Sequence, residues 1–175
     1  MKNKYPNFYF VSSTTKVITD FEEFKREVNR EEFSYVVPDF RLNKDFENLE
    51  GLTQTQKSKV EFLCNECCWF GCKDRKNCYE AVSRKNLGEN QKEHICKSPT
   101  AEKGYRFSEA MKNPGFISIG DIENKYVPMG FSNFKIEGRS LGSALILEFL
   151  LYYMTKPEYH INVREEIYLD NMLDL

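Results

Sequence analysis

The chain has 175 residues, of which 41% are hydrophobic and 30% are charged, and this balance excludes a wholly disordered protein. The formal net charge of −2 gives no bulk positive potential of the kind that indicates nucleic-acid binding. The length suggests one α/β domain over residues 1–175, in which three parts are distinguished. These are the first strand–helix units (1–64), a cysteine-rich segment with a long loop (65–115), and a last strand–helix unit with a C-terminal tail (116–175).

Short apolar runs predict the strands. They lie at residues 8–11, 35–37, 60–63 and 134–136, and the run 116–119 is a fifth candidate. Polar residues follow the four main runs, which are Ser12 to Lys16, Asp39 with Arg41, Asn65 with Glu66, and Glu137 with Arg139.

The first predicted helix follows residue 19. Thr19 as N-cap with Glu22 three residues later has the form of a capping box, in which two amides at the helix start are satisfied. The next apolar residues recur at the spacing of one helix face, and they are Phe21, Phe24 and Val28.

Three further helices are predicted. Asn43 is a candidate cap for a second helix, and residues 73–84 predict a third. Residues 140–154 predict the fourth and most apolar helix, which we expect to be covered on most sides. The inward-facing residues of the second helix would be Phe46, Leu49 and Leu52.

Alternation of strands with helices at intervals of about 25 residues indicates a parallel sheet, either an open doubly wound sheet or part of a barrel. In both architectures, functional residues gather at the C-terminal ends of the strands. We therefore expect the polar strand ends to meet, although loops are polar in any case. Residues 86–115 form a long irregular segment, which is typical of a functional or mobile loop.

No signal-peptide core is visible near Met1, and the apolar run 144–154 is broken by Glu148 and too short to span a membrane. We therefore expect a cytoplasmic protein that does not contact membranes. Because thiols in that compartment are normally reduced, disulfides are the weakest explanation for the six cysteines.

Five cysteines lie within fifteen positions, and a sixth, Cys96, follows in the long loop. Four thiolates suit tetrahedral zinc or an iron–sulfur cluster such as 4Fe–4S. Reduced structural or redox-active cysteines remain the alternative, and Cys64 at a strand end has the character of a core residue. The candidate ligands are Cys68, Cys72, Cys78 and Cys96, with Cys67 and His94 as alternatives.

The two histidines offer little basis for hydrolytic catalysis. His94 is more plausible as a solvated loop residue than as a ligand, and His160 has no evident partner. No Ser–His–Asp or Cys–His arrangement that would provide a general base is recognisable. Peptide hydrolysis is therefore not favoured.

Two segments resemble a known family. The first, residues 63–79, contains N-E-C-C-W-F-G-C-K-D-R-K-N-C-Y and is similar to an N-E-x-C-x3-C-x2-R-x2-H-Y pattern. The second, residues 130–140, reads G-F-S-N-F-K-I-E-G-R-S and is similar to a G-(I/F)-x-x-F-K-I-E-G-R signature. Both patterns are typical of the second half of TIM-barrel proteins related to the collagenase-like peptidases of unknown catalytic type.

This resemblance implies a (β/α)8-type fold with a four-cysteine site that holds an iron–sulfur cluster in several relatives. Those relatives include proteins assigned as peptidases and others implicated in oxygen-independent hydroxylation of RNA bases or quinone precursors. By position, Cys68, Cys72 and Cys96 would be ligands, and Cys78 stands where the pattern has His. The candidate catalytic residues at the barrel mouth would be Lys135, Glu137 and Arg139.

The residues of the second motif also suggest chemistry independently of the resemblance. Strand alternation would place Lys135 and Glu137 on one face, where the two side chains could pair. Gly138 would permit a tight turn, and Arg139 at the start of the last helix would suit a phosphate or carboxylate. A purely structural Lys–Glu–Arg network is the equal alternative.

The length conflicts with a closed barrel, which takes about 250 residues. Half a barrel leaves two sheet edges exposed, so we expect a homodimer or a second subunit that completes the fold. Two functions follow as hypotheses. One is a metal- or cluster-binding relative of the collagenase-like peptidase group that acts on a peptide or nucleic-acid-derived substrate. The other is a non-catalytic interaction protein with a protein target, for example a phage or mobile-element inhibitor of a host system.

Overall fold

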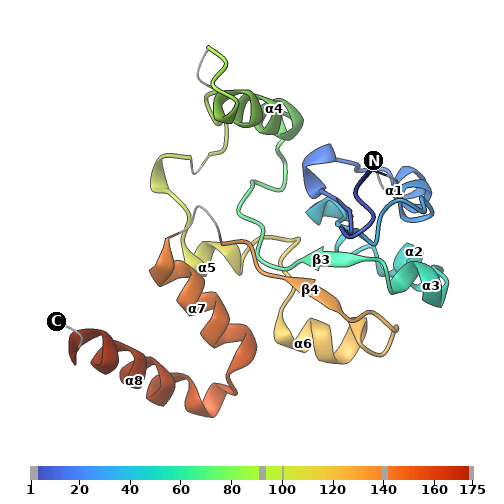
Figure 1. Cartoon of the computed structure of the whole chain (residues 1–175). Coiled ribbons are helices and arrows are strands. Elements are labelled where there is room, and N and C mark those ends of the chain that lie inside the picture. The colour runs from blue at the N-terminus through green and yellow to red at the C-terminus, as the bar shows by residue number, and fades with distance from the viewer. Residues whose placement is uncertain (1–3, 91–93, 100, 139–141, 174–175) are drawn as a thin grey trace.

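The computed structural model describes residues 4–90, 94–99, 101–138 and 142–173, and its strands form two small parallel sheets (Figure 1). An isolated parallel bridge between Val36 and Val60 links the second strand to the third. The four strands therefore follow one another in chain order and run in one direction. The pairs are β1 (Val11–Ser12) with β2 (Tyr35–Val36), and β3 (Glu61–Leu63) with β4 (Asn133–Lys135).

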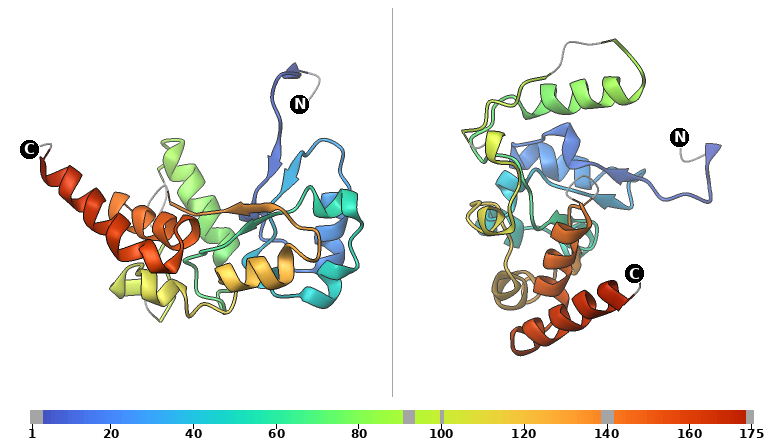
Figure 2. Two further views of the ribbon diagram at one scale, coloured as in Figure 1. Left: turned by 90° about the horizontal axis from the view of Figure 1, so that it is seen from below. Right: turned by 90° about the vertical axis from the view of Figure 1, so that its left-hand side faces the viewer.

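Helices surround these strands, and the protein is of the mixed α/β class. Figure 1 and the right-hand view of Figure 2 place α4 at one end of the molecule and α8 at the opposite end. None of the helices in the described ranges combines the length and apolar character that a membrane crossing requires. The helices are α1 (Phe21–Val28), α2 (Phe46–Glu50), α3 (Gln54–Lys57), α4 (Arg75–Asn86), α5 (Phe107–Ala110), α6 (Ile119–Asp121), α7 (Ser143–Met154) and α8 (His160–Leu173).

The strand predictions are confirmed in number and order for the four main runs, but the strands are shorter than the runs. In the first run, Phe8 and Tyr9 are exposed and precede β1. The fifth candidate at 116–119 is wrong, because Ile119 already begins α6. The segment 116–119 contacts the residue after β3 through one backbone hydrogen bond, which the Ile117 amide donates to the Cys64 carbonyl at 3.0 Å.

Both predicted helix caps were placed on the wrong residue. The N-cap of α1 is Asp20, not Thr19, and its side chain accepts the Glu23 amide at 2.8 Å. Asn43 does not cap α2. Its buried amide group instead donates to the carbonyls of Leu63 and Gly115, at 3.0 and 2.8 Å, and ties the second strand's loop to the third.

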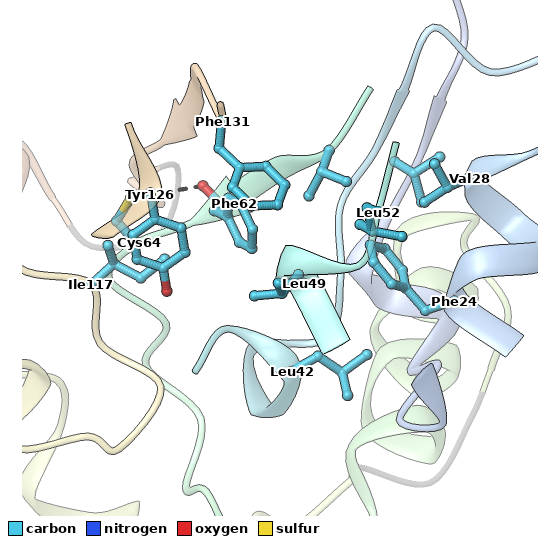
Figure 3. Close-up of a cluster of buried hydrophobic side chains, with 12 residues drawn as sticks. Phe24, Val28, Leu42, Leu49, Leu52, Phe62, Cys64, Ile117, Tyr126 and Phe131 are labelled. Atoms are coloured by element: carbon cyan, nitrogen blue, oxygen red, sulfur yellow. Dashed lines mark hydrogen bonds between the residues drawn. The ribbon is translucent and has the colours of Figure 1, made fainter. Parts of the chain in front are cut away.

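The main core lies between the sheets, helices α1 and α2, and the helical segment Ile122–Tyr126 that continues α6 (Figure 3). The predicted inward faces of α1 and α2 are confirmed. Tyr126 stands at the centre, where its ring packs on Phe62 and its hydroxyl donates to the Asn43 carbonyl at 2.5 Å. The core's buried residues are Phe24, Val28, Val36, Leu42, Leu49, Leu52, Val60, Phe62, Cys64, Ile117, Tyr126 and Phe131.

A smaller cluster forms where α5 meets α7, around the fully buried ring of Phe149. The expectation that the apolar helix at 140–154 is covered on most sides is confirmed in part, since most described residues of α7 are buried or partly buried. Residues 140 and 141 lie outside the described ranges, and in α7 the buried residues are Phe149 and Leu151. The side chain of Met154 is 78% exposed, because α5 and α8 cover only part of the helix surface.

Candidate functional site

The site begins where β3 ends, and Asn65 joins this end to the segment after β4. The Asn65 side chain donates to the Glu137 carbonyl at 3.0 Å and accepts the Glu137 amide at 2.6 Å. The hydroxyl of Tyr105 donates to the Asn65 carbonyl at 2.6 Å. Residues 65 and 137 are therefore held together although 72 positions separate them.

Glu66 fixes the turn that follows. Its side chain is buried, and Oε1 accepts the backbone amides of Cys67 and Cys68 at 2.9 and 3.0 Å. Its other oxygen, Oε2, forms an ion pair with Arg75 from the first turn of α4. Both carboxylate oxygens are thus engaged by protein groups.

Arg75 is the centre of a buried charge network. Its guanidinium contacts Asp39 Oδ2 at 2.5 Å and donates to the Tyr79 hydroxyl at 2.8 Å. It also lies over the Phe40 ring at 4.7 Å. Burial by itself lowers the pKa of Arg75, but the charges of Glu66 and Asp39 outweigh burial and raise it. The guanidinium therefore stays charged.

Arg41 extends this network to the cysteine-rich segment. It pairs with Asp39 at 2.7 Å and donates to the Cys72 carbonyl at 3.1 Å. The polar ends of the second and third strands thus meet, as their positions in the sequence predicted.

A cavity of about 520 Å³ opens beside this turn and collects most of the thiols. Cys67 and Cys96 are exposed, whereas Cys68, Cys72 and Cys78 are partly buried, and all six cysteines of the chain are free. The sulfur and imidazole groups that line the cavity belong to Cys67, Cys68, Cys72, Cys78, Cys96 and His94.

The four predicted ligands are close enough to influence one another electrostatically. Burial raises the pKa of the Cys78 thiol, and the negative charges of Cys68, Cys96 and Cys72 raise it further. Four thiols from three segments of the chain therefore face one space.

Cys67 and Cys68 form a hydrogen-bonded pair of adjacent thiols. The hydrogen bond from Cys67 is the main cause that lowers the pKa of Cys68, and Arg75 adds to it. The same hydrogen bond raises the pKa of Cys67. Cys68 is therefore the more acidic thiol of the pair. The ligand atoms of Glu66, Cys67 and Cys68 lie within 4.8 Å of one another, and this group could hold a metal ion.

Glu137 approaches the thiol pair from the other strand. Burial, followed by the charge of Glu66, raises its pKa to about 7, and hydrogen bonds from Cys67 oppose this shift. Within the described part of the chain, its Oε2 atom is buried and has no hydrogen-bond partner.

Other predicted site residues lie elsewhere. The expected pairing of Lys135 with Glu137 is wrong: Lys135 is exposed and its ammonium is 3.4 Å from Glu61, because β4 ends at Lys135 and strand alternation does not reach Glu137. Arg139 lies outside the described residues. His94 lines the cavity 3.8 Å from Asp74, and Cys64 is a core residue whose pKa burial raises to about 12.

Two residues outside the predicted site set are central to the site. Arg75 connects Glu66 and Asp39, and Tyr105 supports Asn65. The sequence carries a signal for Arg75. It is a basic residue at the start of the helix predicted at 73–84, shortly after the strand end that carries Glu66. The position of Tyr105 depends on the path of the long loop and carries no such local signal.

Fold and site together define a mixed α/β protein with a cysteine-lined cavity at the ends of its parallel strands. Comparisons with protein-family profiles, with curated proteins and with solved structures gave no match to this chain.

Proposed function

We propose that the protein binds an iron–sulfur cluster, or alternatively zinc, through Cys68, Cys72, Cys78 and Cys96. The observation that carries this proposal is the cavity that all four thiols line. Thiolates are the preferred ligands of both groups. Arg75 lines the cavity and Arg41 donates to the Cys72 carbonyl, and both guanidiniums are already paired with Asp39 and Glu66.

The spacing of the thiols favours the cluster over a single ion. Four sulfurs at about 2.3 Å from one zinc ion lie within about 4 Å of one another. Among the described residues, the one set of three ligand atoms mutually within 4.8 Å is that of Glu66, Cys67 and Cys68. A polynuclear cluster accommodates more widely spaced thiols than one ion does.

The resemblance to the collagenase-like peptidase group supports the same proposal. Four parallel strands in chain order are compatible with half of a (β/α)8 barrel, which a partner subunit would complete. A peptide or nucleic-acid-derived substrate would then bind at the strand ends, where the cavity lies. Of the candidate catalytic residues that the structure describes, Glu137 interacts with Cys67, whereas Lys135 lies beside Glu61.

Reconstitution tests the cluster directly. The protein is purified without oxygen and incubated with iron and sulfide, and absorbance is recorded together with iron, sulfide and zinc content. We expect four irons and four sulfides per chain, and loss of both in Cys72→Ser and Cys96→Ser. Cys67→Ser is the matched control, since it makes the same change next to a ligand and should keep the cluster. Free thiols and no bound metal in the wild-type protein would overturn the proposal.

Exposed apolar side chains on α7 and α8 support the second candidate function, a protein that works by binding another protein. Met154, Ile161 and Leu169 are 78%, 67% and 56% exposed. Light scattering of the purified chain measures its mass. A stable dimer that Ile161→Glu converts to monomer would support a self-associating face, and a monomer that co-purifies with no partner would oppose this candidate.

A further inference from the structure

Cys67 and Cys68 are neighbours in the chain whose sulfur atoms also lie close together, within 4.8 Å of each other. In an extended chain, successive side chains point to opposite sides, so adjacent thiols face apart. Here the Oε1 atom of Glu66 accepts the backbone amides of both residues, at 2.9 and 3.0 Å, and the chain turns around this oxygen. The turn therefore brings the two thiols together.

Residues from other parts of the chain hold this turn in place. The second carboxylate oxygen of Glu66 forms a buried ion pair with Arg75 of α4. Asn113, which lies between α5 and α6, donates to the Cys68 carbonyl at 2.9 Å. Two reacting groups that are held near each other lose little freedom when they react. The pair is therefore positioned for a reaction that joins its two sulfur atoms.

Small molecules can reach the pair. Cys67 is exposed, Cys68 is partly buried, and both thiols are free and line the cavity. Among the described residues, no third thiol lies within 4.8 Å of both sulfur atoms. A reagent that reacts at either thiol therefore has the other thiol of the pair beside it.

We propose that Cys67 and Cys68 form a redox-active dithiol, which a small disulfide such as oxidised glutathione converts to a vicinal disulfide. One thiolate attacks a sulfur of the small disulfide, forms a mixed disulfide and releases the first small thiol. The second thiolate attacks the protein sulfur of the mixed disulfide, forms the bond between Cys67 and Cys68 and releases the second small thiol. The protein loses two electrons and two protons, and the small disulfide gains them as two thiols.

The geometry of adjacent residues makes this bond easy to reverse. Neighbouring Cα atoms are about 3.8 Å apart, whereas disulfides usually join Cα atoms separated by about 4.4–6.8 Å. A vicinal disulfide is therefore strained, and strained disulfides are readily reduced. The site suits reversible oxidation better than a permanent cross-link. It does not rest on the proposed cluster, but Cys68 belongs to both sets, so the dithiol is available in the metal-free protein.

Oxidation of the full chain, followed by peptide mapping, tests the site. The protein is reduced, freed of metal with chelator and incubated with oxidised glutathione, and the remaining thiols are blocked with iodoacetamide. Cleavage after Glu66 and after Trp69 releases the peptide 67–69, which separates the pair from the other cysteines. We expect this peptide in a form that is two hydrogens lighter and not alkylated. Excess reduced glutathione before blocking should return it to the doubly alkylated form.

Two variants identify the thiols that react. Cys67→Ser should abolish the vicinal disulfide and leave Cys68 as a mixed disulfide with glutathione. Cys64→Ala is the matched control, because it removes a nearby thiol that lies in the core and not in the cavity, and it should leave the yield unchanged. Circular dichroism verifies that each variant is folded.

Three outcomes in the folded wild-type protein would overturn the proposal. The peptide 67–69 could remain doubly alkylated after oxidation, it could be linked to the peptide that carries Cys72, or its disulfide could resist excess reduced glutathione. None of these outcomes affects the cluster test, which uses iron and sulfide with the reduced protein. Conversely, a wild-type chain that forms no cluster but yields the reversible vicinal disulfide would leave the dithiol as a separate property of the protein.

Discussion

Two groups of ionisable side chains meet at the turn after β3, and they differ in how completely the protein satisfies them. On one side, Arg75 and Arg41 are paired with the buried carboxylates of Asp39 and Glu66. On the other side, a set of thiols lines a cavity, and nearby Glu137 has a buried Oε2 with no hydrogen-bond partner among the described residues. The first group has the properties of a scaffold, and the second has those of a place for a ligand.

The largest effect should follow from breaking the scaffold. Arg75→Met removes the cation between Asp39 and Glu66, so buried Glu66 loses its ion pair and Asp39 keeps only the one with Arg41. Such a loss costs about 3–5 kcal/mol. Denaturant unfolding of the metal-free protein measures this free energy. Lys76→Met, one residue later on the exposed face of α4, serves as control and should cost less than about 0.5 kcal/mol. If the two variants lost equal stability, Arg75 would not organise the turn.

Asp121 contrasts with Glu137, because its carboxylate has several hydrogen-bond partners. Burial raises the pKa of Asp121, but hydrogen bonds from Lys44 and Ser118 outweigh this and lower the pKa to about 2. The Ser118 hydroxyl donates at 2.8 Å and its amide at 3.1 Å. The folded protein therefore gains stability from the ionised group.

The sign of this contribution fixes its pH dependence. Because the folded-state pKa lies below the ordinary aspartate value of 3.8, the stabilisation is complete above that pH and is lost as the pH falls towards 2. Asp121→Asn should cost about 1–2 kcal/mol at pH 7, a figure reduced for partial exposure. In urea unfolding at pH 7, 5, 4 and 3, the difference in unfolding free energy between wild type and Asp121→Asn should shrink as the pH falls. A stability difference that does not change with pH would contradict the lowered pKa of Asp121.

Local sequence signals predicted much of this arrangement. The close spacing of Cys68, Cys72 and Cys78 restricts how far their thiols can separate, so their common cavity could be anticipated. Polar residues at the ends of parallel strands meet for topological reasons, which anticipated the proximity of Asp39 and Glu66. Both inferences need only the chain order and the direction of the strands.

Other parts depend on contacts that no local pattern encodes. The predicted pairing of Lys135 with Glu137 fails because it requires strand alternation to continue past the end of β4 at Lys135. The exposure of Leu150 and Met154 on α7 carries no local signal, because the surface available to cover a helix is a property of the whole chain. Asn43 has the composition of a helix cap, but its amide satisfies carbonyls at residues 63 and 115. Long-range hydrogen bonds override such propensities.

The smallest change in stability is expected for Cys78→Ser, and it tests whether the thiols form a ligand site or part of the Arg75 scaffold. Cys78 lines the cavity and is partly buried, yet among the described residues of the metal-free protein no hydrogen bond involves its thiol. Cys78→Ser should therefore change the free energy of unfolding by no more than about 0.5 kcal/mol in that state. Thermal unfolding with and without the bound cluster measures this.

With the cluster bound, the same substitution should remove most of the added stability, because a ligand that binds only the folded state stabilises it in proportion to its affinity. Wild type and Cys78→Ser would then differ in unfolding temperature when the cluster is bound and have the same unfolding temperature without metal. If Cys78→Ser instead destabilised both states equally, the thiols would belong to the scaffold, and the division drawn at the turn after β3 would disappear.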